Sequence, residues 1–114
     1  MSSSSLLDQI QLQPESIQFS DCIDFIDENF YFIPTAFENG IQKNNIGQNN
    51  GSCKIFAFGL LHNLTEKQTL ACFGDYYRKD VLNNPDADDH QNIRQFMLHG
   101  WSGIKFSVQA LVEK

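Results

Sequence analysis

The apolar run from Ile55 to Leu61 constrains the fold of this chain more than any other segment. Its hydrophobic residues fall on every side of a helical projection, so a helix that contains them has to be buried all round. With Ser52 as the N-cap, we expect this helix over roughly residues 53–62, at the centre of the molecule. Because the run is short, its period also fits a buried strand over Ile55–Leu61, which stays open as the alternative.

Helical patterns flank this run on both sides. A short helix is expected to end before Pro14, and a second one to be capped by Ser20 or Asp21. Thr65 and Gln68 form a capping-box pattern at the start of a third, and Asp88 or Asp89 caps a last helix that ends at Gly100. The apolar stripes of these helices are, in chain order, Leu6, Leu7, Ile10 and Leu12; Phe19, Ile23, Ile26 and Phe30; Leu70, Phe73, Tyr77 and Val81; Ile93, Phe96 and Met97. We expect the following residues to be nearly fully buried: Ile23, Ile26, Phe56, Leu60, Phe73, Ile93 and Phe96.

Two segments are typical of strands. Asn39-Gly40 is the strongest hairpin signal in the chain, and it predicts an edge-type hairpin near residues 31–43, with Pro34 limiting the first arm. Residues 101–108 read as a C-terminal strand. The sequence therefore predicts an α+β fold, with about four to five helices packed with a small antiparallel sheet. A serine-rich tail of residues 1–5 is expected to be disordered, ahead of a single domain over residues 6–114.

The distribution of charged and apolar residues indicates which classes of partner the chain is expected to bind. The net charge is −6, and residues 1–42 contain no Lys or Arg, so we expect no binding to nucleic acid. No apolar stretch is long enough to span a membrane, and no signal peptide is visible, so we expect a cytoplasmic protein without a membrane partner. The three cysteines lack paired spacing, which favours reduced thiols. We expect a monomer.

Several strings, taken together, resemble the HopJ type III effector family. The resemblance covers about residues 14–106. The matching strings are Pro34-Thr35-Ala36-Phe37, Asn39-Gly40, Gly47-Gln48-Asn49, Gly51-Ser52-Cys53-Lys54, Phe56-Ala57, Leu70-Ala71-Cys72-Phe73-Gly74, Tyr76-Tyr77-Arg78, Asp80-Val81-Leu82, and His90, Asn92-Ile93-Arg94, Phe96-Met97 and His99-Gly100-Trp101.

The resemblance implies a family but no mechanism. The family takes its name from a protein that a plant pathogen delivers through its type III secretion system, and it offers no agreed activity or catalytic residues. Secretion into a host cell would require an N-terminal export signal. The polar start Met1–Ser5 is compatible with such a signal and with an ordinary tail. The bacterial cytoplasm is therefore the default location.

The segment of residues 39–53 is the first candidate site. It is rich in Asn, Gln and Gly, which favours a surface loop able to form many hydrogen bonds. We expect a binding module that uses this loop to recognise an unknown protein or small-molecule partner, with Asn39, Gln48, Asn49 and Trp101 as binding residues. Tyr76, Tyr77 and Arg78 form a second candidate recognition surface, although packing is the commoner role of such residues.

The alternative function is a thiol-dependent acyl hydrolase or transferase. Cys53 near a helix N-terminus would be the nucleophile, because the dipole and free N–H groups there favour a thiolate. His99 would be its base. The string from Gln48 to Cys53 is loosely similar to the nucleophile region of papain-like proteases, and this resemblance implies that Gln48 would help to form an oxyanion hole. Asp88, Asp89 or Asn92 would orient the histidine.

The remaining candidate ligands and thiols favour structural roles. Asp86, Asp88 and Asp89 suit a loop and an N-cap, and His90 and His99 fall on opposite faces of one helix. We therefore expect no metal site and no cofactor. Cys22 and Cys72 are expected in the core.

Overall fold

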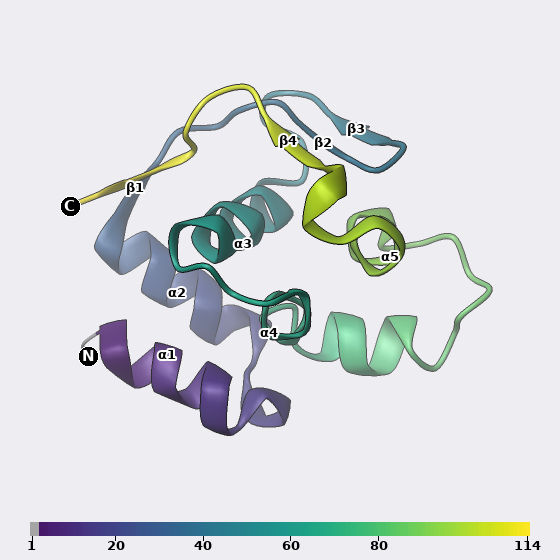
Figure 1. The fold of residues 1–114 in the computed structure, drawn as a ribbon, viewed down its shortest axis with the longest axis horizontal. Helices are drawn as coiled ribbons and strands as arrows, with labels where there is room; N and C mark the ends of the chain where they lie inside the picture. Colours follow the sequence, from purple (N-terminus) through teal and green to yellow (C-terminus); the bar gives the residue numbers. More distant parts are fainter. Residues whose placement is uncertain (1–2) are drawn as a thin grey trace.

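Helix α3 (Asn50–Leu61) lies at the centre of the molecule, as Figure 1 shows. The computed structural model describes residues 3–114. Residues 55–59 of α3 are buried, which confirms the helical interpretation of the apolar run and excludes the strand. The run is not buried to its end, because Leu60 and Leu61 are 47% and 44% exposed. The prediction that Leu60 belongs to the core is therefore wrong.

The other helices surround α3. In chain order they are α1 (Ser3–Leu12), the 3-10 helix η1 (Pro14–Ser16), α2 (Phe19–Asn29), α4 (Glu66–Ala71), the π-helix η2 (Tyr76–Val81), α5 (Gln91–His99) and the 3-10 helix η3 (Gly100–Gly103). Ser3–Ser5 belong to α1, whereas residues 1–2 of the predicted tail lie outside the described residues. No helix within residues 3–114 is long and apolar enough to cross a membrane.

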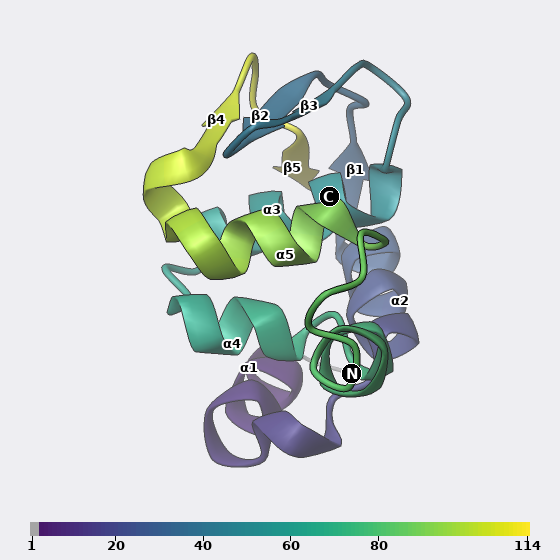
Figure 2. The same ribbon diagram turned by 90° about the vertical axis from the view of Figure 1, so that its right-hand side faces the viewer.

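Two small antiparallel sheets cover one side of the helices, and Figure 2 shows them above α3 and α5. Strand β2 (Phe37–Asn39) lies between β3 (Gln42–Asn44) and β4 (Ile104–Phe106). Strand β1 (Phe30–Phe32) pairs with β5 (Leu111–Glu113). Each sheet thus joins a strand from the first half of the chain to one from its C-terminal end, and the α+β prediction is confirmed.

The hairpin at Asn39-Gly40 forms as predicted, but its arms are shorter and it takes a different place in the sheet. Its first arm is β2, which is central in its sheet and not an edge strand. Pro34 lies outside both β1 and β2, so it does not interrupt a ladder. At the C-terminus, β4 is shorter than the predicted strand because Trp101 belongs to η3, and β5 was not predicted.

Gly74 interrupts the helix that was expected to continue from Thr65 to Val81. The capping box forms: the Thr65 hydroxyl accepts from the Gln68 N–H at 3.1 Å, and the Gln68 side chain accepts from the Thr65 N–H at 2.9 Å. Gly74 then adopts φ +60°, and a Cβ placed on it would lie 2.6 Å from the Phe19 backbone nitrogen. This close approach to the start of α2 divides the segment into α4 and η2.

Three helices begin at other residues than the sequence predicts. Asn49 and not Ser52 precedes α3, and His90 and not Asp88 or Asp89 precedes α5. Helix α2 begins after Gln18, ahead of both predicted caps. The earlier start of α3 places Cys53 beyond the first residues of the helix.

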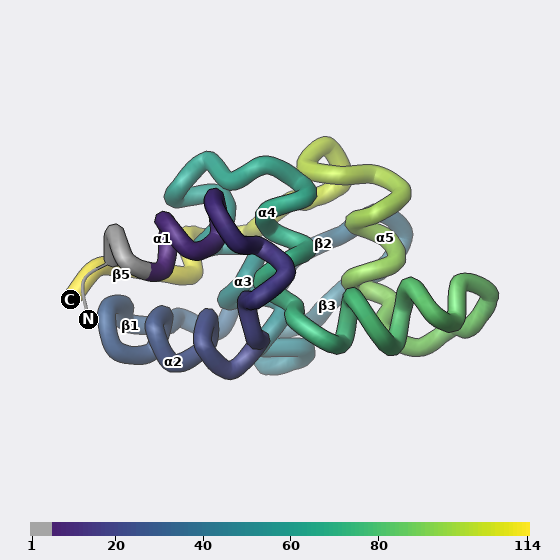
Figure 3. The backbone as a smooth tube through the Cα atoms, turned by 90° about the horizontal axis from the view of Figure 1, so that it is seen from below, coloured from purple at the N-terminus to yellow at the C-terminus, as the bar shows by residue number. Residues whose placement is uncertain are grey.

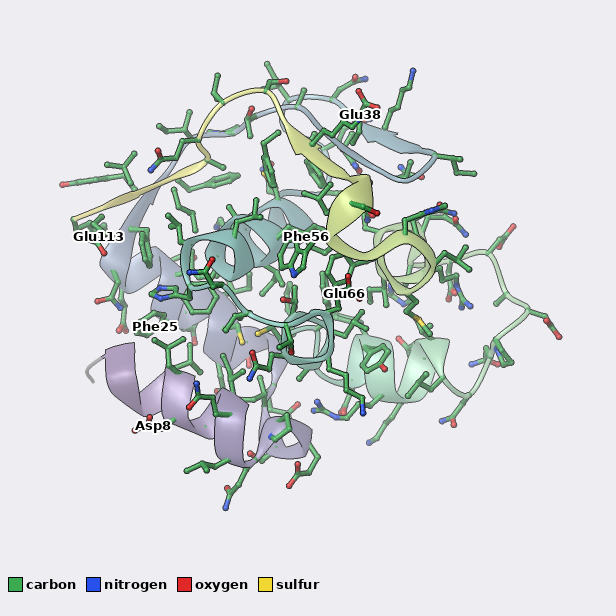
Figure 4. The ribbon with its side chains drawn as sticks, in the orientation of Figure 1. Asp8, Phe25, Glu38, Phe56, Glu66 and Glu113 are labelled. Carbon is green, nitrogen blue, oxygen red and sulfur yellow. The ribbon has the colours of Figure 1, made fainter. Side chains whose placement is uncertain are left out.

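The core is rich in phenylalanine and is centred on Phe56, which contacts the rings of Phe37, Phe73, Phe96 and Trp101. Figure 4 shows Phe56 inside the molecule, and Glu38 on the outer side of the sheet. Of the expected core residues, Ile26, Phe56, Phe73, Ile93 and Phe96 are buried, while Ile23 is partly buried. Met97 also departs from its predicted stripe and is 45% exposed.

Candidate functional site

Cys53 lies in an environment that opposes thiolate formation. It has no exposed surface, and its thiol points to the carbonyl oxygen of Thr35 at 4.0 Å. Burial raises the pKa of the Cys53 thiol from 9.0 to about 11, although the hydrogen bond to Thr35 and the charge of Lys54 act in the other direction. The lowered pKa that the thiol-enzyme hypothesis requires is therefore contradicted.

The other residues of the thiol-enzyme hypothesis do not gather around Cys53. Within residues 3–114, no histidine nitrogen lies within hydrogen-bonding distance of the Cys53 sulfur. His99 is exposed at the end of α5, beside the hairpin turn, where its ring would meet a Cβ placed on Gly40. Gln48 is also exposed, and its side chain accepts a hydrogen bond from the Asn45 N–H at 3.0 Å.

Asn39, expected at a binding surface, is instead the buried end of an asparagine cluster formed by Asn39, Asn44, Asn49 and Asn92. The Asn92 side-chain oxygen accepts hydrogen bonds from Asn39 at 3.1 Å and from Asn44 at 3.2 Å. Asn44 in turn accepts from Asn92 at 2.9 Å and from Asn49 at 2.7 Å. The cluster holds the hairpin against the start of α5 and α3, so Asn39 does not reach a ligand.

Trp101 is held by the protein rather than presented to a partner. Its ring N–H donates to the Leu64 carbonyl at 3.0 Å, and its backbone N–H donates to the Glu66 carboxylate at 3.1 Å. The ring packs against Phe96 with a centroid distance of 5.0 Å. It also approaches Gly59, where a Cβ would lie 2.8 Å from the indole. The structure therefore gives Trp101 a packing role.

A pocket of about 570 Å³ lies where the segment of residues 39–53 meets the N-terminus of α5. Its size is in the range of small-molecule sites, which are about 300–1,000 Å³. Three groups of residues line it: Gln42, Asn49, Gly51 and Ser52 from the predicted loop; Phe19, Phe73 and Tyr76 from the aromatic wall; and Asp88, His90, Gln91, Asn92 and Ile93 from the start of α5.

Two helix N-termini reach this pocket. Gly51 and Ser52 belong to the first turn of α3, and Gln91 and Asn92 to the first turn of α5. First-turn N–H groups have no partner inside a helix. Neither N-cap residue compensates, because Asn49 and His90 adopt left-handed backbone conformations, with φ of 54° and 51°, and form no capping side-chain hydrogen bond. The polar side of the pocket is therefore rich in donors.

Salt bridges hold the segment that precedes α5. His90 Nε2 lies 3.2 Å from an Asp80 carboxylate oxygen, which joins the pocket edge to η2. Arg94 pairs with Asp89 at 2.7 Å and donates to the Asn84 carbonyl at 2.9 Å. The hydrogen bond from Arg94 lowers the pKa of the Asp89 carboxyl. In Figure 3, η2 and this connecting segment extend together from one end of the molecule.

The pocket is lined by only one of the four residues predicted for binding. Asn49 lines the pocket, whereas Asn39 and Trp101 do not, and Gln48 is absent from its lining. Phe19, Gln42, Ser52 and Gln91 were missed. Tyr76 was noted as a candidate recognition residue, and its ring lies beside that of Phe19, with 5.2 Å between the ring centroids. Within the described residues, no group of three or more His, Cys, Asp or Glu side chains is arranged to hold a metal ion.

Two comparisons with known proteins indicate the family of this chain. The family model of the HopJ type III effector protein matches residues 3–111. The crystal structure of the unknown function protein VPA0580 superposes with a TM-score of 0.98 at 51% sequence identity, covering 100% of this chain and 95% of that one. No curated protein matches the chain. The chain therefore belongs to the HopJ type III effector protein family.

Proposed function

We propose that this protein is a small-molecule binding module whose site is the pocket between the segment of residues 39–53, η2 and the start of α5. The observation that carries this proposal is the composition of the pocket wall. Gln42, Asn49, Gly51 and Ser52 provide its polar side from the predicted recognition segment, and aromatic residues provide the opposite side. Small-molecule sites commonly combine an apolar wall with a few convergent polar groups.

The pocket favours a small molecule over a protein partner for this segment. A protein partner would need a wide contact surface, with about 800 Å² covered on each side. The segment instead contributes polar side chains to a concave site, while Asn39 and Asn44 are buried. We also propose that the protein does not bind nucleic acid, because its net charge is −6 and no Lys or Arg lines the pocket.

The test is a ligand screen that is read out residue by residue. A mixed library of neutral, anionic and cationic small molecules is screened by ¹H–¹⁵N NMR against the whole chain. We expect one or more compounds to shift the amide signals of Asn49–Ser52 and His90–Ile93. The same compounds should raise the melting temperature, because they bind only the folded state.

Two tryptophan variants separate this pocket from other surfaces. Ser52→Trp places an indole on the pocket wall and should abolish binding. Leu12→Trp changes a side chain that is 79% exposed on α1 and should leave binding unchanged. If compounds bind both variants equally, or if no compound of any class shifts these amides, the proposed site is wrong.

A further inference from the structure

We propose that the ligand of this pocket is a small neutral sugar, a mono- or disaccharide. Its hydroxyl groups would bind the amide-rich wall, and the C–H face of its ring would rest on the aromatic wall. The inference rests on the proposed function, because it names the ligand class of the same pocket. Three independent properties of the wall support it: its charge, its hydrogen-bonding groups and the geometry of its rings.

The charge of the pocket disfavours strongly anionic ligands. Its lining contains no Lys or Arg, and Asp88 adds a carboxylate. Proteins that bind phosphate groups commonly supply Arg or Lys, whose charge-assisted hydrogen bonds are the strong ones. The N-termini of α3 and α5 add partial positive charge, which the Asp88 carboxylate in the same lining offsets, and their N–H groups can also donate to an uncharged hydroxyl or ring oxygen. A neutral ligand therefore fits this wall better than a nucleotide does.

The free polar groups of the wall are of mixed type. The Gln42 amide and the Ser52 hydroxyl each donate and accept, and neither has a hydrogen-bond partner within residues 3–114. The Asp88 carboxylate, also without a side-chain partner there, only accepts when ionised. Sugar hydroxyls donate and accept as well, so one ring with several hydroxyls can satisfy all three groups.

The rings around Tyr76 are tilted to one another rather than parallel, and the His90 ring lies 5.4 Å from the Tyr76 ring at an angle of 41°. Tyr76 is 45% exposed, and its ring meets that of Phe19 nearly at right angles, at 75° and 5.2 Å between centroids. Phe19 is stacked on the buried Phe73 at 6.4 Å. A planar base held between two rings would need them parallel. A partly exposed ring such as Tyr76, with its negative quadrupole, suits the C–H hydrogens of a saturated ring.

Gly51 allows the aromatic and polar walls to meet. A Cβ placed on Gly51 would lie 2.9 Å from Phe19 Cζ. Any larger residue would push the Phe19 ring away from α3, and the Tyr76 ring packed against it would lose its support. The close contact between an α3 first-turn residue and the ring therefore sets the width of the proposed sugar site.

The experiment titrates the whole chain with glucose, galactose, N-acetylglucosamine and cellobiose, followed by ¹H–¹⁵N NMR. AMP and inorganic phosphate are titrated in parallel. We expect at least one sugar to bind in the millimolar range or tighter, with shifts at Gln42, Asn49–Ser52 and His90–Asn92. Tyr76→Ala should weaken this binding about tenfold or more, because it removes the partly exposed ring of the aromatic wall. Tyr76→Phe should retain it.

A matched control and the parallel titrations keep the outcomes distinct. Tyr31→Ala removes a tyrosine that is 62% exposed on β1 and should not change sugar binding. If only AMP or phosphate shifts the pocket amides, the pocket is a ligand site but the sugar assignment is wrong. If the library and all these probes leave the amides unchanged, the proposed function fails with it. Equal loss in Tyr76→Ala and Tyr31→Ala would also overturn the sugar assignment.

Discussion

At the scale of single residues, burial decides the chemistry of Cys53. The sequence pattern places a thiol near a helix start, where a lowered pKa is expected. The structure moves the start of α3 back to Asn50 and packs the thiol inside the core. Desolvation, the largest influence on this group, raises the pKa of Cys53 to about 11. The hydrogen bond to Thr35 and the charge of Lys54, which act in the other direction, are therefore outweighed by the loss of water.

Cys53 should be inert to alkylation near neutral pH. Because its pKa rises from 9.0 to about 11, its thiolate fraction at pH 8 is roughly 100-fold below that of an unshifted thiol. Iodoacetamide labelling, resolved by mass spectrometry, should show slow modification of Cys53 that His99→Ala does not change. Full labelling in urea is the control. Rapid native labelling that depends on His99 would restore the thiol-enzyme hypothesis.

The same shift has a consequence for stability. A thiol whose folded pKa is raised contributes its full stability below pH about 9, and this is lost as the pH rises through about 11. Between pH about 9 and about 11, the free energy of unfolding measured in urea should therefore decline less in Cys53→Ala than in the wild type. Cys72, whose pKa is raised by a hydrogen bond with Cys22 and by burial, contributes in the same direction and is unchanged in both proteins.

The asparagine cluster shows why residue roles were only partly predictable. Asparagine-rich sequence is typical of exposed loops, so Asn39 was assigned to the surface. Its partner Asn92 is 53 positions away, and no local pattern indicates that the two side chains meet. Asn49, whose position depends on the local turn before α3, was predicted as a binding residue and lines the pocket.

At the scale of elements, local sequence signals predicted the existence of the helices more accurately than the residues at which they begin and end. The Thr65–Gln68 capping box formed as predicted because both of its hydrogen bonds are local. The break at Gly74 was missed because its cause is not local: the start of α2 occupies the space that a side chain would need. The helix starts at Asn49 and His90 were missed because both residues take left-handed conformations that asparagine and histidine adopt only occasionally.

Gly74→Ala should destabilise the protein more than Gly47→Ala does. Both glycines have positive φ, +60° and +86°, so both substitutions introduce backbone strain of about 1–2 kcal/mol. Only at Gly74 does the added Cβ also meet backbone, 2.6 Å from the Phe19 nitrogen, whereas Gly47 faces open space. Urea denaturation of both variants measures the difference. Equal reductions in the free energy of unfolding would show that the contact between Gly74 and Phe19 does not contribute to stability.

At the scale of the whole molecule, the pairings between distant strands complete the fold. The sequence predicted the α+β class and the hairpin, because both depend on local periodicity and turn residues. It did not predict β5 or its pairing with β1, since a strand of this length carries little pattern of its own. Which strands pair depends on how the helices bring the chain together.

Leu111→Ala should be strongly destabilising. Leu111 is 1% exposed and pairs with Phe32, so its truncation should reduce the free energy of unfolding by about 2–5 kcal/mol. Val112 is on the same strand but 42% exposed, so Val112→Ala should reduce the free energy of unfolding much less. Chemical denaturation of both variants provides the comparison. Similar small effects would mean that β5 is not part of the cooperative core.

The pairing of β1 with β5 and of β2 with β4 also determines when the chain can acquire its structure during synthesis. Phe30 pairs with Glu113, and Asn39 with Ile104, so neither sheet can be complete until β4 and β5 have left the ribosome. Loop closure over such separations slows folding relative to the local helices. A nascent chain of this protein therefore passes through a stage in which helices are present and the strands near residues 30–44 are still unpaired, a stage at which chaperones can engage it.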